Sequence, residues 1–239
     1  MVHNVPMRLV LASASPARRA TLIAAGITPI VRVSTVDEEA VLAALPGGRA
    51  FSGGATTPAD EVAALAAAKC ADVCEALAQG DSELPEGDPV LVVGCDSMLE
   101  IDGQMLGKPH TPEVARERIR AMRRTSATLW TGHSAAILAP ASSTDGRTRT
   151  RTVSASVTRS ASTQVHFGDI SDAEIDAYVA TGEPLHVAGS FTVDGLGGPF
   201  IEGVTGDYHS VVGISLPLLR SMASELGVFW PDLWVAPRP

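Results

Sequence analysis

PVLVVGC, at residues 89–95, is the strongest signal for a buried strand in this chain of 239 residues. An unbroken apolar run of this length is typical of a central strand in an α/β sheet, because both faces of such a strand are covered. Asp96 follows the run directly, so we expect its carboxylate at the carboxyl end of the strand, where open α/β sheets bind ligands. A carboxylate there can hold a divalent cation or activate water, although Asp-Ser is also common in turns.

Further strands and capped helices flank this run on both sides. We expect strands at residues 8–12, 29–33, 98–101, 104–106, 127–138 and 152–167. We expect helices at residues 16–25, 57–78, from 111, 171–180 and 216–226. Arg147, Arg149 and Arg151 alternate beside the last strand, where a solvated edge is expected and a phosphate patch is the alternative. Strands mixed with helices predict an α/β fold with a mixed sheet, in one domain over residues 1–239.

Composition restricts the class of protein. Hydrophobic residues make up 45% and charged residues 19%, proportions typical of a folded globular chain. A net charge of −9 argues against binding of polymeric nucleic acid, which needs a basic surface, but allows a small polyanion bound with a divalent cation. No apolar run approaches the roughly 20 residues of a membrane span, and the N-terminus does not resemble a signal peptide. We therefore expect a cytoplasmic protein.

The junction between the first strand and the helix after it is suited to phosphate. Ser15 is a good N-cap and Pro16 a good first helical residue, so free backbone N–H groups and the positive end of the helix dipole face the junction. Ser13 adds a hydroxyl, and Arg18 and Arg19 add guanidinium groups that match phosphate oxygens. The alternative is an ordinary helix cap with surface arginines.

Two lysines are candidates for the same chemistry. Lys108 lies between Gly107 and Pro109, on rigid backbone that can aim an ammonium at a phosphate, although a solvated loop lysine is the alternative. Lys69 is a lone charge in an apolar helix, so its side chain either snorkels to solvent or reaches into a site. His133 is expected to be a buried strand histidine with its hydrogen bonds satisfied, rather than a ligand.

Three cysteines, Cys70, Cys74 and Cys95, form no CxxC pair and are expected to be reduced, apolar residues. Cys70 and Cys74 share a helix face. A metal pair there is the alternative, but no histidine or further cysteine completes a tetrahedral set.

Taken together, these signals form a pattern that spans about residues 8–226. The sequence resembles the Maf family of nucleoside triphosphate pyrophosphatases, the septum-formation proteins. The matching segments are residues 11–19 (LASASPARR), 36–39 (VDEE), 65–69 (LAAAK), 94–97 (GCDS), 107–109 (GKP), 131–133 (TGH), 178–184 (YVATGEP), 206–208 (GDY) and 211–213 (VVG). They occur in the family's order.

The resemblance implies a two-lobed α/β fold shared with inosine triphosphate pyrophosphatases, with the active site in the cleft between the lobes. It implies that Asp96 is the proton acceptor and that Glu38, with Asp96, lies near a divalent metal cation, Mg²⁺ or Mn²⁺. It also implies a phosphate-binding set made of Ser13, Arg18, Lys69 and Lys108, to which the junction itself adds the Ser15 hydroxyl. A homodimer is implied by the resemblance alone.

Three positions depart from the family's pattern. Ala17 stands where the first arginine of Ser-Pro-Arg-Arg is expected, and Val187 replaces the lysine of Asp-Lys-Ala-Gly. Asp194 stands where glutamine is frequent in members that cleave dTTP and UTP, and glutamate in those that cleave methylated guanine nucleotides. Asp194 could accept a hydrogen bond from a base N–H or help to hold the metal, but it cannot donate when ionised, so the preferred base stays open.

We therefore expect a pyrophosphohydrolase that converts a nucleoside triphosphate, pyrimidine or modified, into its monophosphate and pyrophosphate. Cations that neutralise the triphosphate and a carboxylate that orients water fit that reaction. One alternative is a nucleotide-sensing regulator of septum formation with weak catalysis or none. Another is a generic phosphate site in a transferase or sugar-phosphate enzyme, for which no acceptor pocket is evident.

Overall fold

The computed structural model describes residues 7–79, 81, 83–84, 87–141 and 150–235. Its strands form one open mixed sheet in the order β2-β1-β3-β5-β6-β7, with β4 paired to the far end of β3. The strands are β1 (Arg8–Ala12), β2 (Ile30–Val31), β3 (Val90–Ile101), β4 (Gln104–Leu106), β5 (Ser126–Pro140), β6 (Arg151–Phe167) and β7 (Ile201–Thr205). The predicted α/β fold with a mixed sheet is confirmed.

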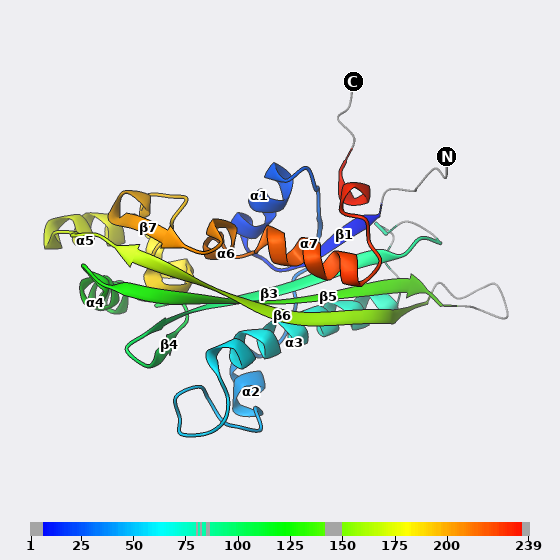
Figure 1. Cartoon of the computed structure of the whole chain (residues 1–239), viewed down its shortest axis with the longest axis horizontal. Coiled ribbons are helices and arrows are strands. Elements are labelled where there is room, and N and C mark those ends of the chain that lie inside the picture. Colours follow the sequence, from blue (N-terminus) through cyan, green and yellow to red (C-terminus); the bar gives the residue numbers. More distant parts are fainter. Residues whose placement is uncertain (1–6, 80, 82, 85–86, 142–149, 236–239) are drawn as a thin grey trace.

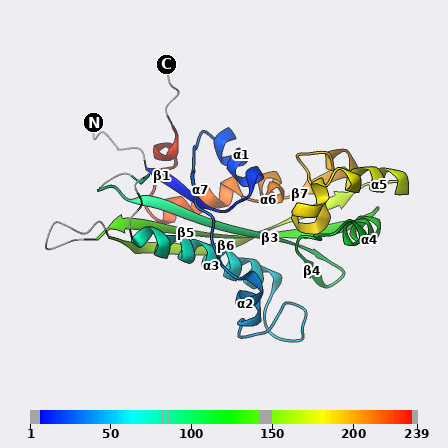
Figure 2. The same ribbon diagram turned by 180° about the vertical axis from the view of Figure 1, so that it is seen from behind.

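Helices flank the sheet on both faces (Figure 1). The α-helices are α1 (Pro16–Ala24), α2 (Glu38–Ala43), α3 (Pro58–Ala78), α4 (Pro112–Met122), α5 (Asp172–Ala180), α6 (Tyr208–Val212) and α7 (Leu216–Glu225). The 3-10 turns are η1 (Glu183–His186), η2 (Ala188–Ser190), η3 (Gly198–Phe200) and η4 (Trp230–Leu233). Seen from the front and from behind, α3 runs under one face of the sheet while α1, α6 and α7 lie over the other (Figure 2).

The predicted caps explain where these helices begin. Ser15 accepts a hydrogen bond from the Arg18 N–H at the start of α1, and Pro16 is the first helical residue. Thr57 and Ser171 form capping boxes at α3 and α5, and Thr111 caps α4. Serine and threonine side chains thus satisfy N–H groups that have no partner within the helix.

β3 contains both parallel and antiparallel pairing. β1 lies parallel to β2 and β3, and its last residue, Ala12, pairs with Gly94. β3 then continues to Ile101 as the antiparallel partner of β5. The prediction that Asp96 ends its strand is therefore wrong, because residues 98–101, predicted as a separate strand, extend the same one. Asp96 instead lies just past the end of the parallel part, which still opens a site there.

Alternation along the strands assigns each side chain to one face. Leu91, Val93 and Cys95 belong to the apolar cluster under α1 and α7, whereas Val90 and Val92 pack with Cys70, Val73 and Cys74 of α3. Asp96 therefore faces α3 and Ser97 faces α1 and α6. The cysteines are buried and free, and Cys70 and Cys74 share a face as predicted.

Two glycines let α3 lie unusually close to the sheet. A Cβ atom at Gly94 would lie 2.5 Å from the Ala66 carbonyl oxygen, and one at Gly132 would lie 1.9 Å from that of Val62. Because Asp96 pairs with Gly132 across β3 and β5, the same close approach brings Lys69 of α3 over Asp96. The strand glycines thus position the charged side chains.

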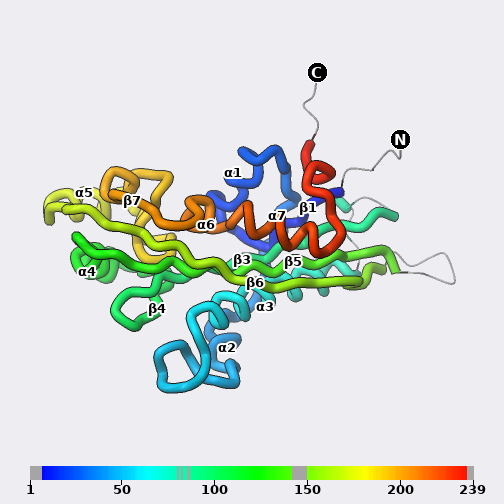
Figure 3. Tube along the Cα trace, viewed as in Figure 1, coloured from blue at the N-terminus to red at the C-terminus, as the bar shows by residue number. Residues whose placement is uncertain are grey.

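Two apolar clusters divide the molecule into two lobes along the sheet. The first includes Cys95 and the residues under α1 and α7, and the second includes Leu99 with α4 and α5. Asp96 and Ser97 lie between them. β3, β5 and β6 run through both lobes (Figure 3). The site predicted from the resemblance therefore lies where the two lobes meet.

Some local predictions were incomplete or wrong. α2, α6 and β7 were not predicted, because each is only five or six residues long and gives little periodicity. Arg151 is not a solvated edge residue: it is buried and donates to the carbonyl oxygens of Asp88 and Leu138. Arg147 and Arg149 lie outside the described residues. None of the described helices is long and apolar enough to cross a membrane.

Candidate functional site

A lysine and two carboxylates meet on the α3 side of the sheet. The Lys69 ammonium donates to Asp96 Oδ1 at 2.6 Å and lies 2.6 Å from Glu38 Oε1. Asp96 is held by β3, Lys69 by the tightly packed α3, and Glu38 by the first turn of α2, whose N-cap is Asp37. The two carboxylates thus converge on the Lys69 ammonium. This side chain does not snorkel to solvent but reaches between them.

Burial makes the two carboxylates unequal. The Asp96 side chain is 11% exposed, and this burial raises the pKa of Asp96 although the Lys69 and Arg18 charges oppose it. The Glu38 side chain is 50% exposed, so the nearby positive charges together affect its pKa more than burial does. Partial burial raises the pKa of Glu38, but the hydrogen bond and charge of Lys69, with the charges of Lys108 and Arg18, outweigh it and lower this pKa. Asp96 is the stronger base of the pair.

A second cluster of polar side chains forms on the α1 side. Arg18 donates through Nη1 to Ser13 Oγ at 3.0 Å, through Nη2 to Ser97 Oγ at 3.1 Å, and through Nε to the Gly213 carbonyl oxygen at 2.7 Å. This guanidinium therefore connects α1, β3 and the end of α6. Two of its five N–H groups are left for a ligand.

Hydroxyl groups extend this cluster toward α6. Ser97 Oγ lies 3.0 Å from Thr131 Oγ1, which donates to the Ser210 carbonyl oxygen. His133, on the same face of β5, accepts from the Ser215 N–H at 2.8 Å, so its other ring nitrogen donates to the Thr131 carbonyl oxygen. Burial lowers the pKa of His133 to about 4, which keeps the ring neutral. The prediction of a satisfied strand histidine is confirmed.

Lys108 follows the end of β4. It is exposed, and its positive charge helps to lower the pKa of Glu38. The Gly107 carbonyl oxygen before it accepts from Arg118 Nη1 at 2.8 Å and from the Gly189 N–H at 3.3 Å. The backbone that carries Lys108 is thereby fixed to α4 and η2.

Asp194 is not joined to the charged residues by any ion pair or hydrogen bond found in the described residues. It is exposed on the segment 192–197, which Glu183 holds in shape. The Glu183 carboxylate accepts hydrogen bonds from Tyr178, from the Thr192 hydroxyl and from the backbone N–H groups of Leu196 and Gly197. The segment is therefore preformed, with Asp194 on its outer side.

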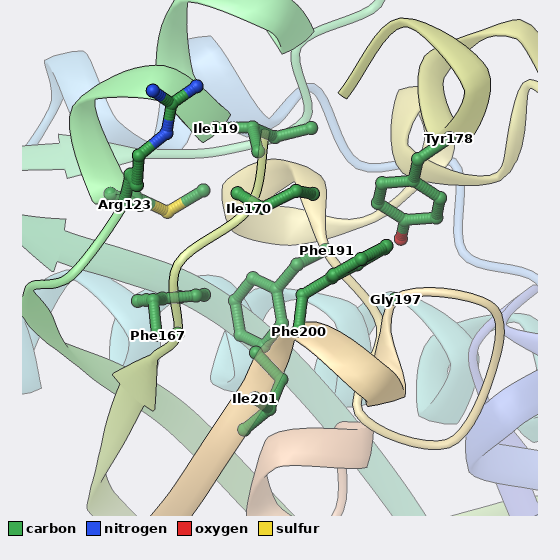
Figure 4. A pocket seen from close by; sticks show the side chains of 11 residues that line it. Ile119, Arg123, Phe167, Ile170, Tyr178, Phe191, Gly197, Phe200 and Ile201 are labelled. Carbon is green, nitrogen blue, oxygen red and sulfur yellow. The ribbon is translucent and has the colours of Figure 1, made fainter. Parts of the chain in front are cut away.

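The cavity in the second lobe is a different feature (Figure 4). It is lined by apolar side chains, including Phe167 and Phe191, which meet edge to face with their centroids 4.9 Å apart. The Arg123 guanidinium at its rim points away from these rings. A volume of about 20 Å³ holds little more than one water molecule, so this cavity is no nucleotide pocket.

The residues present fit a hard divalent cation. Among the described residues no group of three His, Cys, Asp or Glu side chains forms a complete metal site. Mg²⁺, however, is commonly held by one or two carboxylates together with substrate phosphates and water. Glu38 and Asp96, which already converge on a single cation, supply such a pair.

These elements follow one another along nearly the whole chain, and the family model described as Maf-like protein matches residues 8–226. The chain belongs to the Maf family. The Maf segments that contain Ser13, Glu38, Lys69, Asp96 and Lys108 are thus the ones that meet at the junction of the two lobes.

Individual relatives of this Maf protein are similar over nearly their full length. A protein of Nocardia farcinica named nucleoside triphosphate pyrophosphatase is 50% identical over 230 residues, 96% of this chain and 97% of its own. Proteins with the same name from Saccharopolyspora erythraea and Rhodococcus jostii are 49% and 48% identical. They cover 97% and 95% of this chain, and 99% and 96% of their own length.

Sequence reasoning missed the groups that support the site. Ser97 and Thr131 lie within the matching segments, yet a hydroxyl next to an aspartate or a glycine gives no signal of its own. Glu183 lies in the matching segment 178–184, where nothing in the sequence indicates its role. Its four hydrogen bonds join residues up to fourteen positions away, which no local pattern shows.

Proposed function

We propose that this Maf protein is a nucleoside triphosphate pyrophosphohydrolase that cleaves between the α and β phosphates, giving a nucleoside monophosphate and pyrophosphate. The convergence of Lys69, Glu38 and Asp96 beside the Arg18 cluster carries this proposal. The names of relatives about 50% identical over nearly their whole length support it.

Each side chain has a role that follows from its surroundings. Asp96, buried and with a raised pKa, accepts a proton from the attacking water and orients it toward the α-phosphorus. Lys69 and Lys108 offset the negative charge of the triphosphate. Ser13 and Ser15 lie at the start of α1, whose N-terminus favours phosphate, and Arg18 offers its two remaining N–H groups.

The proposal includes a divalent cation, Mg²⁺ or Mn²⁺, held by Glu38 and Asp96. When bound, such a cation neutralises phosphate charge that develops during cleavage. The carboxylates of these two residues would be its protein ligands. The hydrogen bond from Arg18 to Ser97 connects α1 to β3 beside these two carboxylates.

The preferred substrate is proposed to be a pyrimidine triphosphate, dTTP or UTP, or a modified nucleotide. Asp194, exposed on the 192–197 segment, is the residue proposed to influence the base preference. Because Glu183 preforms this segment, base preference would depend on its outer side chains rather than on an induced closure.

The test is a panel of canonical and modified triphosphates, each with and without Mg²⁺ or Mn²⁺. Phosphorus NMR distinguishes monophosphate plus pyrophosphate from diphosphate plus orthophosphate. Turnover in ¹⁸O-labelled water is expected to place the label in the monophosphate if water attacks the α-phosphorus. The Asp96→Ala variant is the control for a contaminating activity.

Two outcomes would contradict the proposal. Release of orthophosphate and a diphosphate would move the cleaved bond. Thermal stabilisation by a nucleotide that is never consumed, with every cation, would instead favour the nucleotide-sensing regulator.

A further inference from the structure

Lysine is almost absent from this chain. Of 18 basic residues counted as lysine or arginine, only Lys69 and Lys108 are lysines, and the remaining 16 are arginines. Both lysines lie at the candidate site, and the Arg18 guanidinium beside them is fixed by three hydrogen bonds. An arginine fork gives a rigid, directional contact, whereas a lysine ammonium on a four-carbon chain can change partners. The choice of lysine at position 69 therefore suggests a cation that moves.

Lys69 holds both carboxylates that were assigned to the divalent cation. Its ammonium is 2.6 Å from Glu38 Oε1 and 2.6 Å from Asp96 Oδ1, and its side chain is 13% exposed. No other ion pair to Glu38 or Asp96 occurs among the described residues. One ammonium thus pairs with both carboxylates.

We propose that Lys69 is a built-in stand-in for the divalent cation: metal entry displaces its ammonium from Glu38 and Asp96, and the freed ammonium then binds the triphosphate. This inference rests on the proposed function, because it concerns the same site. It adds a binding order that the proposed function does not contain.

Charge balance explains why the exchange would be coupled to nucleotide. Metal alone must compete with the Lys69 ammonium, which already pairs with both carboxylates, and it would leave this ammonium without these partners. A triphosphate supplies oxygens for the released ammonium and for the metal together. Metal and nucleotide should therefore raise each other's affinity, and by the same factor.

Metal affinity in the nucleotide-free protein tests the exchange directly. Mn²⁺ binding, measured by electron paramagnetic resonance, is expected to be roughly tenfold tighter in Lys69→Met than in wild type, the scale of one lost ion-pair competitor. Lys108→Met removes the same charge near Glu38 without breaking that ion pair, so it should change Mn²⁺ affinity by less than about threefold. Lys69→Arg keeps a cation there, and a less mobile one, so it should bind Mn²⁺ no more tightly than wild type.

If Lys69 only binds phosphate and does not exchange with the metal, a different result is expected. Mn²⁺ affinity equal in wild type and Lys69→Met, or raised no more than in Lys108→Met, would overturn the exchange. Pyrophosphate release is measured on the same wild-type preparation. If Lys69→Met binds Mn²⁺ more tightly but wild type releases no pyrophosphate, the proposed function alone is rejected. If wild type releases pyrophosphate but Lys69→Met does not bind Mn²⁺ more tightly, the exchange alone is rejected.

The wild-type protein offers a second measurement that does not depend on a variant folding. With only two lysines, ¹⁵N-lysine labelling gives two side-chain signals, and Lys69→Arg assigns them. Mg²⁺ without nucleotide is expected to shift the Lys69 signal and speed its proton exchange as the ion pair opens, with a smaller effect at Lys108. An unchanged Lys69 signal at a Mg²⁺ concentration that calorimetry shows to be saturating would overturn the proposal.

Discussion

The two faces of the sheet differ in kind at neighbouring residues of one strand. Asp96 faces α3 and pairs with Lys69, which also pairs with Glu38. Ser97 faces α1 and α6 and meets a guanidinium and a hydroxyl that are already bonded to the protein. Strand alternation thus separates two tasks: one face presents charge that can react, and the other holds the neighbouring elements in place.

The largest expected effect is on the charged face. Asp96→Asn preserves the shape of the side chain but removes the proton acceptor, so kcat should fall by a factor on the order of 10² or more with the fold retained. Ser97→Ala should cost less than about tenfold, because it removes one supporting hydrogen bond. Steady-state pyrophosphate release measures both. Equal losses in the two variants would break the division between the faces.

Gly132→Ala tests the close approach of α3. The added methyl would lie 1.9 Å from the Val62 carbonyl oxygen, so α3 must shift, and the free energy of unfolding should fall by about 2 to 3 kcal/mol. Gly107→Ala, where nothing lies within 4 Å of the new methyl, is the matched control and should change stability by less than about 0.5 kcal/mol. Urea denaturation compares them, and similar midpoints would mean that α3 is not held by Gly132.

On the α1 side of the sheet, His133 should make the free energy of unfolding depend on pH. His133 has a folded-state pKa of about 4, below the value of about 6.5 for an unfolded chain, so the unfolded state binds the extra proton between these values. Stability is therefore complete above about pH 6.5 and should fall by about 2 kcal/mol by pH 5. Urea denaturation of wild type and His133→Gln over this range measures it. Parallel curves would exclude His133 as the cause.

Arg18→Lys is expected to give the smallest effect of the four. The charge is kept, but an ammonium cannot reach Ser13, Ser97 and Gly213 at once, so kcat/KM should fall about tenfold. Arg18→Met also removes the charge and the N–H groups proposed to bind phosphate, so kcat/KM should fall further than in Arg18→Lys. If both variants lost the same amount, the role of Arg18 would be limited to holding Ser13, Ser97 and Gly213 in place.

Local sequence signals predicted much of this fold. Apolar runs marked the long strands, and serine or threonine followed by proline or an acidic residue marked the helix starts. They also indicated Ser13, Lys69 and Asp96 individually as candidate site residues. That these residues belong together came from the order of the matching segments.

Other features depend on contacts that no local pattern contains. The continuation of β3 past Asp96 depends on β5, which pairs with it to Glu100. The burial of Arg151 depends on carbonyl groups of Asp88 and Leu138. The joint contact of Lys69 with Glu38 and Asp96 requires two helices, α3 and α2, and one strand, β3, from three parts of the chain. The predicted homodimer stays a prediction.

The continuity of β3, β5 and β6 has a mechanical consequence. These strands have 12, 15 and 17 residues, and each carries side chains of both apolar clusters. A hinge between the halves would have to break several backbone ladders at once, which makes rigid-body closure costly. Adjustment to a nucleotide should fall instead to parts outside these three strands, such as α2, the six-residue helix that carries Glu38.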